Sequence, residues 1–378
     1  MSDFELGPIR PPSETRSLPV RVTRNCPWNR CKFCRSFKGQ KFQLRSLEEV
    51  KQDILSAKVI QDRLLNLSPR FDRDGLREIE VGAFEGQPNQ AVRTVANWLY
   101  GGGRNAFLQD GNTLIMPVND LERVIRFLKE TFLGINRVTT YSSSKTSARR
   151  KIEELARLRE AGLSRIHTGL ESGYDPLLAF MEKGATAADH IEGGRNVVAS
   201  GISLCEYVVL GLGGVKMWRE HAIETARVIN EIAPEFIRLR TLVVTGDMLL
   251  HQEVLSGNFV RMTDEQIIEE EKLFIQNLNC HSNLVSDSIT NLLHEVEGRL
   301  PDDKDHLLGI IDRFQSLDPV ERDIFKMGRR LGVYSHLDDL NDPDQSEAIE
   351  RIMAGHGQYA EQKLNEKVVY ELMERFIR

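Results

Sequence analysis

The feature that most constrains the fold is a regular alternation of helices and strands between residues 147 and 242. Each predicted helix ends at a glycine or just before a proline, and a strand follows it, which is the usual punctuation of such units. The predicted helices are Ser147–Ala161, Ala187–Ser200 and Trp218–Ile232. The strands that follow them are Arg165–Leu170, Ile202–Leu210 and Phe236–Leu242. Strands separated by helices are expected to run parallel in one sheet.

Three further strands are predicted upstream, at Leu18–Thr23, Asn105–Gln109 and Arg137–Tyr141. Helices are predicted between them, one starting at the capping box Ser46-x-x-Glu49 and others at about Asn89–Tyr100 and Asp120–Phe132. A short strand is also predicted at Arg77–Val81. The sequence therefore predicts an α/β fold, a partial (β/α)6 TIM-type barrel, followed from residue 251 by a region with helical patterning and no recognisable strand.

Composition excludes several classes of protein. The chain has 378 residues, of which 40% are hydrophobic and 28% charged, as in ordinary globular proteins. No apolar stretch approaches the roughly 18 residues of a membrane helix, and residues 1–17 lack the apolar core of a signal peptide. A net charge of −6 disfavours a generally basic nucleic-acid-binding surface. With only five cysteines and no export signal, a reducing, cytoplasmic location is expected.

Three of the five cysteines, Cys26, Cys31 and Cys34, lie within nine residues in the run NCPWNRCKFC. A disulfide would leave one thiol over and does not suit a reducing compartment. Structural zinc needs four protein ligands, and the other cysteines and the first histidine lie far downstream. An iron–sulfur cluster suits three thiolates, because one iron then stays open to another ligand. A metal-binding loop with no catalytic role remains an alternative.

The run CPWNRCKFC resembles the cluster loop of radical S-adenosylmethionine (radical SAM) enzymes, although the first gap holds four residues instead of the usual three. A second run, REAGLSRIHTGLESGYDPLL, also resembles this superfamily, in its coproporphyrinogen-oxidase-like and elongator-like branch. The resemblance covers about residues 18–250 and implies a core barrel there, preceded by a leader at 1–17 and followed by a helical region at 251–378. It implies a [4Fe–4S] cluster on the three cysteines and SAM as the second cofactor.

The resemblance also implies which residues contact SAM. Sites in such barrels lie at the carboxyl ends of the strands. Phe33 and the backbone of a glycine are expected near the adenine of SAM. The residues after the second strand are expected to bind its amino group. Serines and a glutamate are expected to contact the ribose or the methionine part. The residues concerned are Phe33, Gln109, Asp110, Gly111, Ser142, Ser143, Glu171, Gly211 and Arg240. A run of serines is also typical of an ordinary turn.

Strand alternation predicts a polar barrel interior. Arg165, His167 and Glu171 alternate with apolar residues in the fourth strand, and Arg238 and Arg240 do so in the sixth. These side chains are expected to point inward, where arginines suit an anionic substrate. The alternative is a buried ion-pair network that satisfies only itself.

The implied chemistry is reductive cleavage of SAM to methionine and a 5′-deoxyadenosyl radical that takes hydrogen from a small-molecule substrate. A one-electron reductant protein of flavodoxin or ferredoxin type is the expected partner, and neither membrane nor nucleic acid is expected to be one. The sequence identifies neither the substrate nor a catalytic residue. Only Cys205 and Cys280 remain for a second cluster, so none is predicted, and Cys205 is expected in the core.

Overall fold

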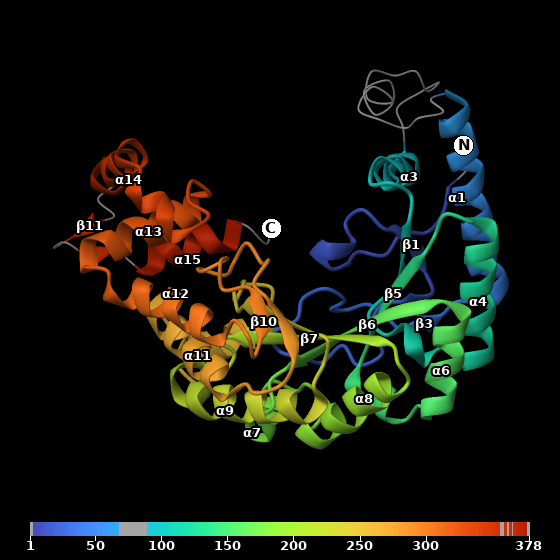
Figure 1. Cartoon of the computed structure of the whole chain (residues 1–378), viewed down its shortest axis with the longest axis horizontal. Helices are drawn as coiled ribbons and strands as arrows, with labels where there is room; N and C mark the ends of the chain where they lie inside the picture. Colours follow the sequence, from blue (N-terminus) through green and yellow to red (C-terminus); the bar gives the residue numbers. More distant parts are fainter. Residues whose placement is uncertain (1–2, 68–88, 356–358, 361–362, 365, 376–378) are drawn as a thin grey trace. The chain divides into compact units, whose positions relative to one another are not determined.

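The computed structural model describes residues 3–67, 89–355, 359–360, 363–364 and 366–375 (Figure 1). The predicted strand Arg77–Val81 lies outside these residues. The chain divides into two compact units. The first unit comprises Met1–Asn29, Ser36–Gly169 and Glu192–Cys205, and the second comprises Arg30–Arg35, Leu170–Ile191 and Glu206–Arg378. Eight strands form the main sheet, in the order β1-β4-β5-β6-β7-β8-β9-β10.

The strands of the first unit pair in parallel, as the sequence predicts. They are β1 (Leu18–Arg21), β4 (Asn105–Gln109), β5 (Arg137–Ser142) and β6 (Leu163–Glu171), the last of which extends into the second unit. The predicted first strand is shorter than expected, because Thr23–Arg24 form a separate strand β2 that pairs antiparallel with β3 (Gln43–Leu44). The mixed, mostly parallel sheet confirms the predicted partial TIM-type fold, and it is not closed into a complete barrel.

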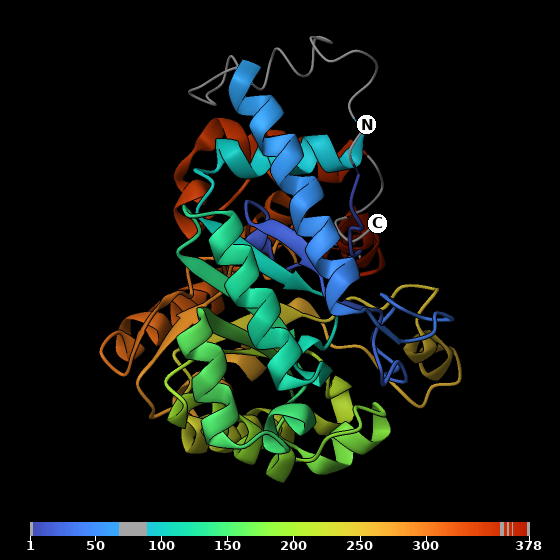
Figure 2. The same ribbon diagram turned by 90° about the vertical axis from the view of Figure 1, so that its right-hand side faces the viewer.

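Helices α1 (Leu47–Leu67), α4 (Val118–Thr131) and α6 (Ile152–Ala161) lie side by side against the strands of the first unit (Figures 1 and 2). Helix α3 (Gln90–Tyr100) packs on α1. The predicted capping box begins α1: the Glu49 N–H donates to Ser46 Oγ at 3.2 Å, and Glu49 Oε2 accepts from the Ser46 N–H at 2.8 Å. The apolar residues of α1 recur every three or four positions and are buried against the sheet.

The predicted helix Ser147–Ala161 ends at Gly162 as expected, but its predicted start is wrong, because the structure has two helices there. Helix α5 spans Ser144–Ala148, and α6 starts at Ile152. The Asn196 side-chain amide lies 3.3–3.5 Å from three carbonyl oxygens at the break, those of Ser147, Ala148 and Arg150. This amide satisfies backbone acceptors that a continuous helix would have used internally.

The second unit contains strands that the sequence did not reveal. Strand β8 (Phe236–Thr241) pairs in parallel with β9 (Ser282–Val285), and β9 pairs antiparallel with β10 (Gly298–Leu300). The expectation that no strand follows residue 250 is therefore wrong. Stretches of three or four residues are too short for a readable alternation of side chains, so only pairing with β8 defines them. Strand β7 (Ser203–Leu210) begins in the first unit and ends in the second.

Helices make up most of the remaining second unit (Figure 1). They are α7 (Asp175–Phe180), α9 (Gly214–Ile232), α10 (Leu249–Leu255), α11 (Asp264–Asn277), α12 (Lys304–Ser316), α13 (Pro319–Leu331), α14 (Pro343–Gly355) and α15 (Glu366–Arg375); α8 (Ala187–Ala199) crosses from the second unit into the first. Helices α9 and α11 pack together, and α14 and α15 both pack on α13. Thr263 and Gln266 form the predicted capping box of α11. None of the helices in the described part of the chain has the length and apolarity needed to cross a bilayer.

Candidate cofactor site

The cysteine loop begins with two asparagines in the left-handed region, where their short polar side chains are tolerated. Asn25 has φ 69° and Asn29 has φ 48°. The Asn25 side chain donates to the Lys41 carbonyl at 2.7 Å, and the Asn29 N–H lies 3.5 Å from the Cys26 sulfur. Asn29 falls within the four-residue gap that is one residue longer than in the radical SAM cluster loop.

Packing within the second unit holds the rest of the loop. The Lys32 N–H donates to the Met181 carbonyl, and the Lys32 carbonyl accepts from the Leu250 N–H, both at 2.9 Å. The Phe33 ring packs against an apolar cluster that includes Met181 and Leu250. Phe33 therefore anchors the loop, and its contact with adenine stays a prediction.

A lysine that the sequence did not single out lies beside the second pair of cysteines. The Lys183 ammonium is 3.0 Å from Glu171 Oε1, and the Lys183 carbonyl is 3.9 Å from the Cys31 sulfur. Burial alone would lower the pKa of Lys183, but the Glu171 carboxylate and the Cys31 and Cys34 thiolates outweigh it and raise that pKa. Lys183 thus keeps its positive charge next to two predicted cluster ligands. No local pattern marks it, because the contact depends on the turn after α7.

Glu171 lies at the end of β6 in a left-handed conformation, with φ 65°. A non-glycine residue there is strained, and such strain is concentrated at functional positions. The pairing with Lys183 fixes its carboxylate within the second unit.

The turn after β4 packs directly on the first cysteine. A β-carbon placed on Gly111 would lie 3.5 Å from Cys26 Cβ and 3.2 Å from the Phe37 ring. The buried Asp110 accepts on Oδ2 from Arg21 at 2.7 and 2.9 Å and from the Asn25 N–H at 3.1 Å. Burial raises the pKa of Asp110, against the opposing effect of these donors.

The second oxygen of Asp110 is buried and has no hydrogen-bond partner among the residues that the structure describes. This oxygen faces the N-terminal segment, because a β-carbon placed on Gly7 would lie 2.7 Å from it. The structure places Gly111 against Cys26, and binding of the amino group of SAM by Asp110 and Gly111 stays a prediction.

Gln109 makes contacts that the sequence did not predict. Its side chain accepts from the Gly7 N–H at 2.9 Å and donates to the carbonyls of Gly7 at 3.2 Å and Ile9 at 2.8 Å. Glu5 pairs with Arg21 at 2.8 Å. The segment predicted as a leader is thus folded onto the ends of β1 and β4, and the role of Gln109 toward SAM stays a prediction.

The serines after β5 are engaged locally. Ser143 caps α5 by accepting from the Thr146 N–H at 3.3 Å, and the Asn112 side chain lies 3.2 Å from its hydroxyl. The Ser142 hydroxyl is 3.0 Å from that of Ser147. These contacts are those of an ordinary turn, and contacts of Ser142 and Ser143 with SAM remain predictions.

The polar interior of the first unit contains the carboxylate of Glu14, which comes from the N-terminal segment. His167 is fully buried, 3.5 Å from a carboxylate oxygen of Glu14, which also pairs with Arg137 at 2.9 Å. The rings of Phe107 and Tyr141 lie beside the imidazole. This part of the interior agrees with the alternative of a buried ion-pair network whose charges pair with one another and bind no ligand.

The arginines of β8 converge on one carboxylate in the second unit. Asp287 accepts from Arg238 and, at 2.8 Å, from Arg240. Burial would raise the pKa of Asp287, but the two guanidinium groups outweigh it and lower that pKa. Arg240 also lies over the Tyr207 ring at 5.0 Å, and within the described residues its Nη2 has no hydrogen-bond partner. Asp287 is thus a carboxylate partner that both arginines share.

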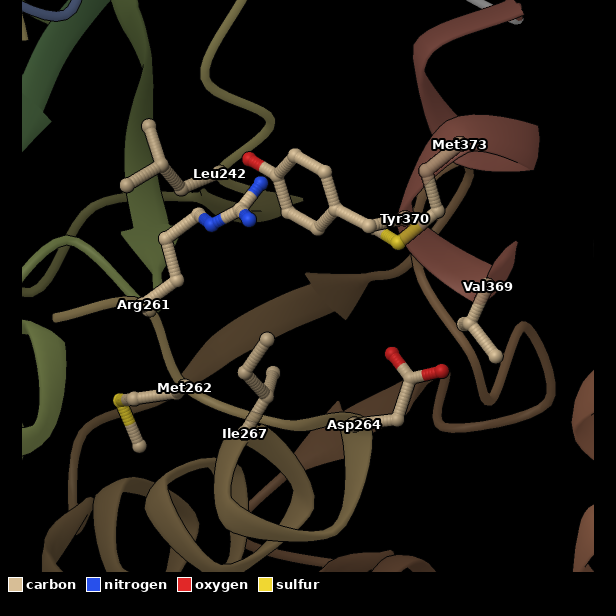
Figure 3. Close-up of a pocket in the computed structure, with 9 residues that line it drawn as sticks. Leu242, Arg261, Met262, Asp264, Ile267, Val369, Tyr370 and Met373 are labelled. Carbon is tan, nitrogen blue, oxygen red and sulfur yellow. The ribbon is translucent and has the colours of Figure 1, made fainter. Parts of the chain in front are cut away.

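Gly211 follows β7 with φ 80°, a conformation that favours glycine. It lines a small pocket together with residues of helix α15 (Figure 3). The Arg261 guanidinium lies 3.7 Å from the centre of the Tyr370 ring, and the Tyr370 hydroxyl accepts from the Val244 N–H. Gly211, predicted at the adenine, therefore lies beside a small pocket of the second unit.

The five cysteines are free thiols, and Cys26, Cys31 and Cys34 are partly exposed while Cys205 and Cys280 are buried. Free, partly exposed thiols fit a cluster that takes three protein thiolates, and they exclude the disulfide alternative for this structure. In the described ranges, no three His, Cys, Asp or Glu side chains form an assembled metal-binding group. Cluster binding by Cys26, Cys31 and Cys34 is accordingly a proposal.

Comparisons with known proteins agree with the resemblance. Residues 74–226 match the model of the Radical SAM superfamily, and this match begins after the three cysteines. A biotin synthase of Clostridium botulinum is 32% identical over 128 residues, which are 33% of this chain and 36% of that enzyme. The chain therefore matches about a third of this curated relative.

Solved structures share little sequence with the chain. The archaeal Elp3 of Methanocaldococcus infernus is 13% identical, with a TM-score of 0.44 over 63% of each chain. The coproporphyrinogen III oxidase of Escherichia coli is 11% identical, with a TM-score of 0.39 over 95% of this chain and 89% of the oxidase.

Residues 74–226 are therefore similar to the Radical SAM superfamily. Enzymes of this superfamily use SAM and a [4Fe–4S] cluster and generally need an external electron donor. The coproporphyrinogen-oxidase-like or elongator-like branch stays a prediction.

Proposed function

We propose that this chain is a radical SAM enzyme that holds a [4Fe–4S] cluster on Cys26, Cys31 and Cys34 and acts on an anionic small molecule. The observation that carries the proposal is the packing of the Asp110–Gly111 turn on Cys26. The same turn carries a buried oxygen of Asp110 that has no hydrogen-bond partner among the described residues. A site for a cluster and an amino acid ligand needs both features.

When held by Cys26, Cys31 and Cys34, a [4Fe–4S] cluster would supply the single electron for reductive cleavage of SAM to methionine and a 5′-deoxyadenosyl radical. Asp110 would accept from the amino group of SAM, and Arg21 holds its other oxygen in place. Glu171, fixed by Lys183, would accept from the ribose hydroxyls. The Gly211 turn would present its backbone to the adenine.

The substrate class follows from Arg238 and Arg240. Their guanidinium groups share Asp287, and a carboxylate or phosphate of the substrate would pair with the remaining donor of Arg240. A flavodoxin-like or ferredoxin-like protein would supply the electron, and the partly exposed cysteines agree with its access to the cluster.

The test is anaerobic reconstitution with iron and sulfide, followed by dithionite and SAM. We expect about four irons per chain, absorbance near 400 nm and release of 5′-deoxyadenosine. Cys31→Ala should abolish all three, whereas Cys280→Ala, which removes a buried thiol outside the loop, should abolish none. Stable loading with zinc and no uptake of iron would refute the proposal and favour a structural metal loop.

A further inference from the structure

A buried histidine of the second unit has no part in the chemistry proposed above. His221 lies on α9 and is 1% exposed. Its Nδ1 is 2.9 Å from the Ser172 hydroxyl and 3.1 Å from the Thr225 hydroxyl. The Ser172 hydroxyl accepts from the Tyr174 N–H at 3.0 Å, and the Thr225 hydroxyl accepts from the Gly173 N–H at 2.8 Å. One ring nitrogen thus binds the turn that follows Glu171.

The other ring nitrogen faces the turn after β7. His221 Nε2 is 3.0 Å from the Val209 carbonyl oxygen and 3.3 Å from Glu270 Oε1. The Glu270 carboxyl in turn accepts from the Gly211 N–H at 3.1 and 3.2 Å. The imidazole is therefore the single side chain through which both turns are connected in this network.

The protonation state of the network is defined by its geometry and burial. Burial lowers the pKa of His221 to about 4, so the ring is neutral near pH 7. The Val209 carbonyl can only accept, so Nε2 carries the hydrogen and Nδ1 accepts from a hydroxyl. Burial also raises the pKa of Glu270 well above its usual range. The ring then donates to the Val209 carbonyl and accepts from a hydroxyl on its other side.

The first turn is seated tightly on α9. A β-carbon placed on Gly173 would lie 2.4 Å from the Glu224 carbonyl oxygen and 2.8 Å from Thr225 Cα. These are backbone atoms of a helix, so they cannot move aside. The close packing therefore fixes the position of this turn on α9. The hydrogen bonds of His221 then connect the turn to Gly211 through Glu270.

We infer that His221 is a positioning residue for binding SAM. It fixes the turn at residues 171–174, which follows β6, relative to the turn at residues 209–213, which follows β7. The inference rests on the proposed function, because Glu171 and Gly211 are its proposed ribose and adenine contacts. A neutral imidazole suits this role, since its two nitrogens lie on opposite sides of a rigid ring.

The first test is hydrogen exchange of the protein without cofactors, followed by mass spectrometry. His221→Phe keeps the ring volume and removes both contacts, and it should speed exchange about tenfold in residues 171–174 and 209–213 together. Ser172→Ala, a milder change, should speed exchange in the first turn only. Val228→Ala, which shortens another buried side chain of α9, should leave both turns unchanged.

The second test uses the reconstituted enzyme. For His221→Phe, we expect the KM for SAM to rise about tenfold with kcat for SAM cleavage within twofold of the parent. Val228→Ala should leave this KM unchanged even if it lowers the Tm.

Two results of the exchange experiment would overturn the inference. One is that His221→Phe speeds exchange in one turn alone. The other is that Val228→Ala speeds exchange in both turns as much as His221→Phe does. If His221→Phe does not fold, the Ser172→Ala variant provides the test. Unchanged exchange in residues 171–174 of that variant would also overturn the inference. If exchange changes as expected but the parent does not bind SAM, the proposed function fails and the link between the turns stands.

Discussion

Glu271 gives the chain a pH-dependent stability whose size follows from its surroundings. This residue lies on α11 and is 3% exposed, and its Oε1 has no hydrogen-bond partner in the residues described. Burial raises the pKa of Glu271 to about 8 from 4.5. Ionisation of Glu271 would also place a negative charge beside Glu270, which holds the Gly211 N–H.

The direction of the effect depends on which state binds the proton. Below pH 4.5 the carboxyl is protonated in both the folded and the unfolded chain. Between pH 4.5 and 8 the unfolded chain releases the proton while the folded chain keeps it, so the free energy of unfolding falls as pH rises. The expected slope is about 1.4 kcal/mol per pH unit, which amounts to about 2 kcal/mol between pH 6 and pH 7.5.

Glu271→Gln keeps the shape of the side chain and cannot ionise. We expect the variant to gain about 2 kcal/mol relative to the parent when the pH rises from 6 to 7.5, because the other titrating groups cancel in the comparison. Urea unfolding followed by circular dichroism at both pH values measures this. The exposed neighbour Glu269 gives the matched control Glu269→Gln, for which no such gain is expected. An equal pH dependence in parent and Glu271→Gln would refute the reasoning.

Two further predictions concern local contacts in each unit. Thr263→Ala removes the capping box of α11 and should lower the free energy of unfolding by about 1 kcal/mol. Thr263→Ser keeps the capping hydroxyl and should retain most of this stabilisation. Thermal unfolding at fixed pH distinguishes the two variants. Asp110→Ala removes one of the two carboxylate partners of the largely buried Arg21 and leaves Glu5, so it should cost about 2 kcal/mol in urea unfolding. A cost under about 0.5 kcal/mol would contradict the assigned pairing.

The fold was predictable to the extent that its signals are local. Helices closed by glycine, and strands long enough to show alternation, were placed within a few residues of their observed bounds. The prediction failed where distant contacts decide. Asn196 divides one predicted helix by binding the carbonyls at the break, and β9 is a strand because it pairs with β8.

The site was predictable in part for the same reason. Asp110 and Gly111 follow a readable strand, and the structure places Gly111 against Cys26. Lys183 and Asp287 were missed because each acts through a partner remote from it in the sequence, Lys183 beside Cys31 and Asp287 between the two arginines of β8.

Sequence alone determined the alternation of strands and helices and the closeness of three thiols, because both are properties of neighbouring residues. Tertiary structure alone decided which buried charges pair and which acceptors stay open, since a salt bridge or a buried hydrogen bond depends on distance in space. The unpartnered oxygen of Asp110, the lysine beside Cys31 and the two-sided contacts of His221 all belong to that second kind.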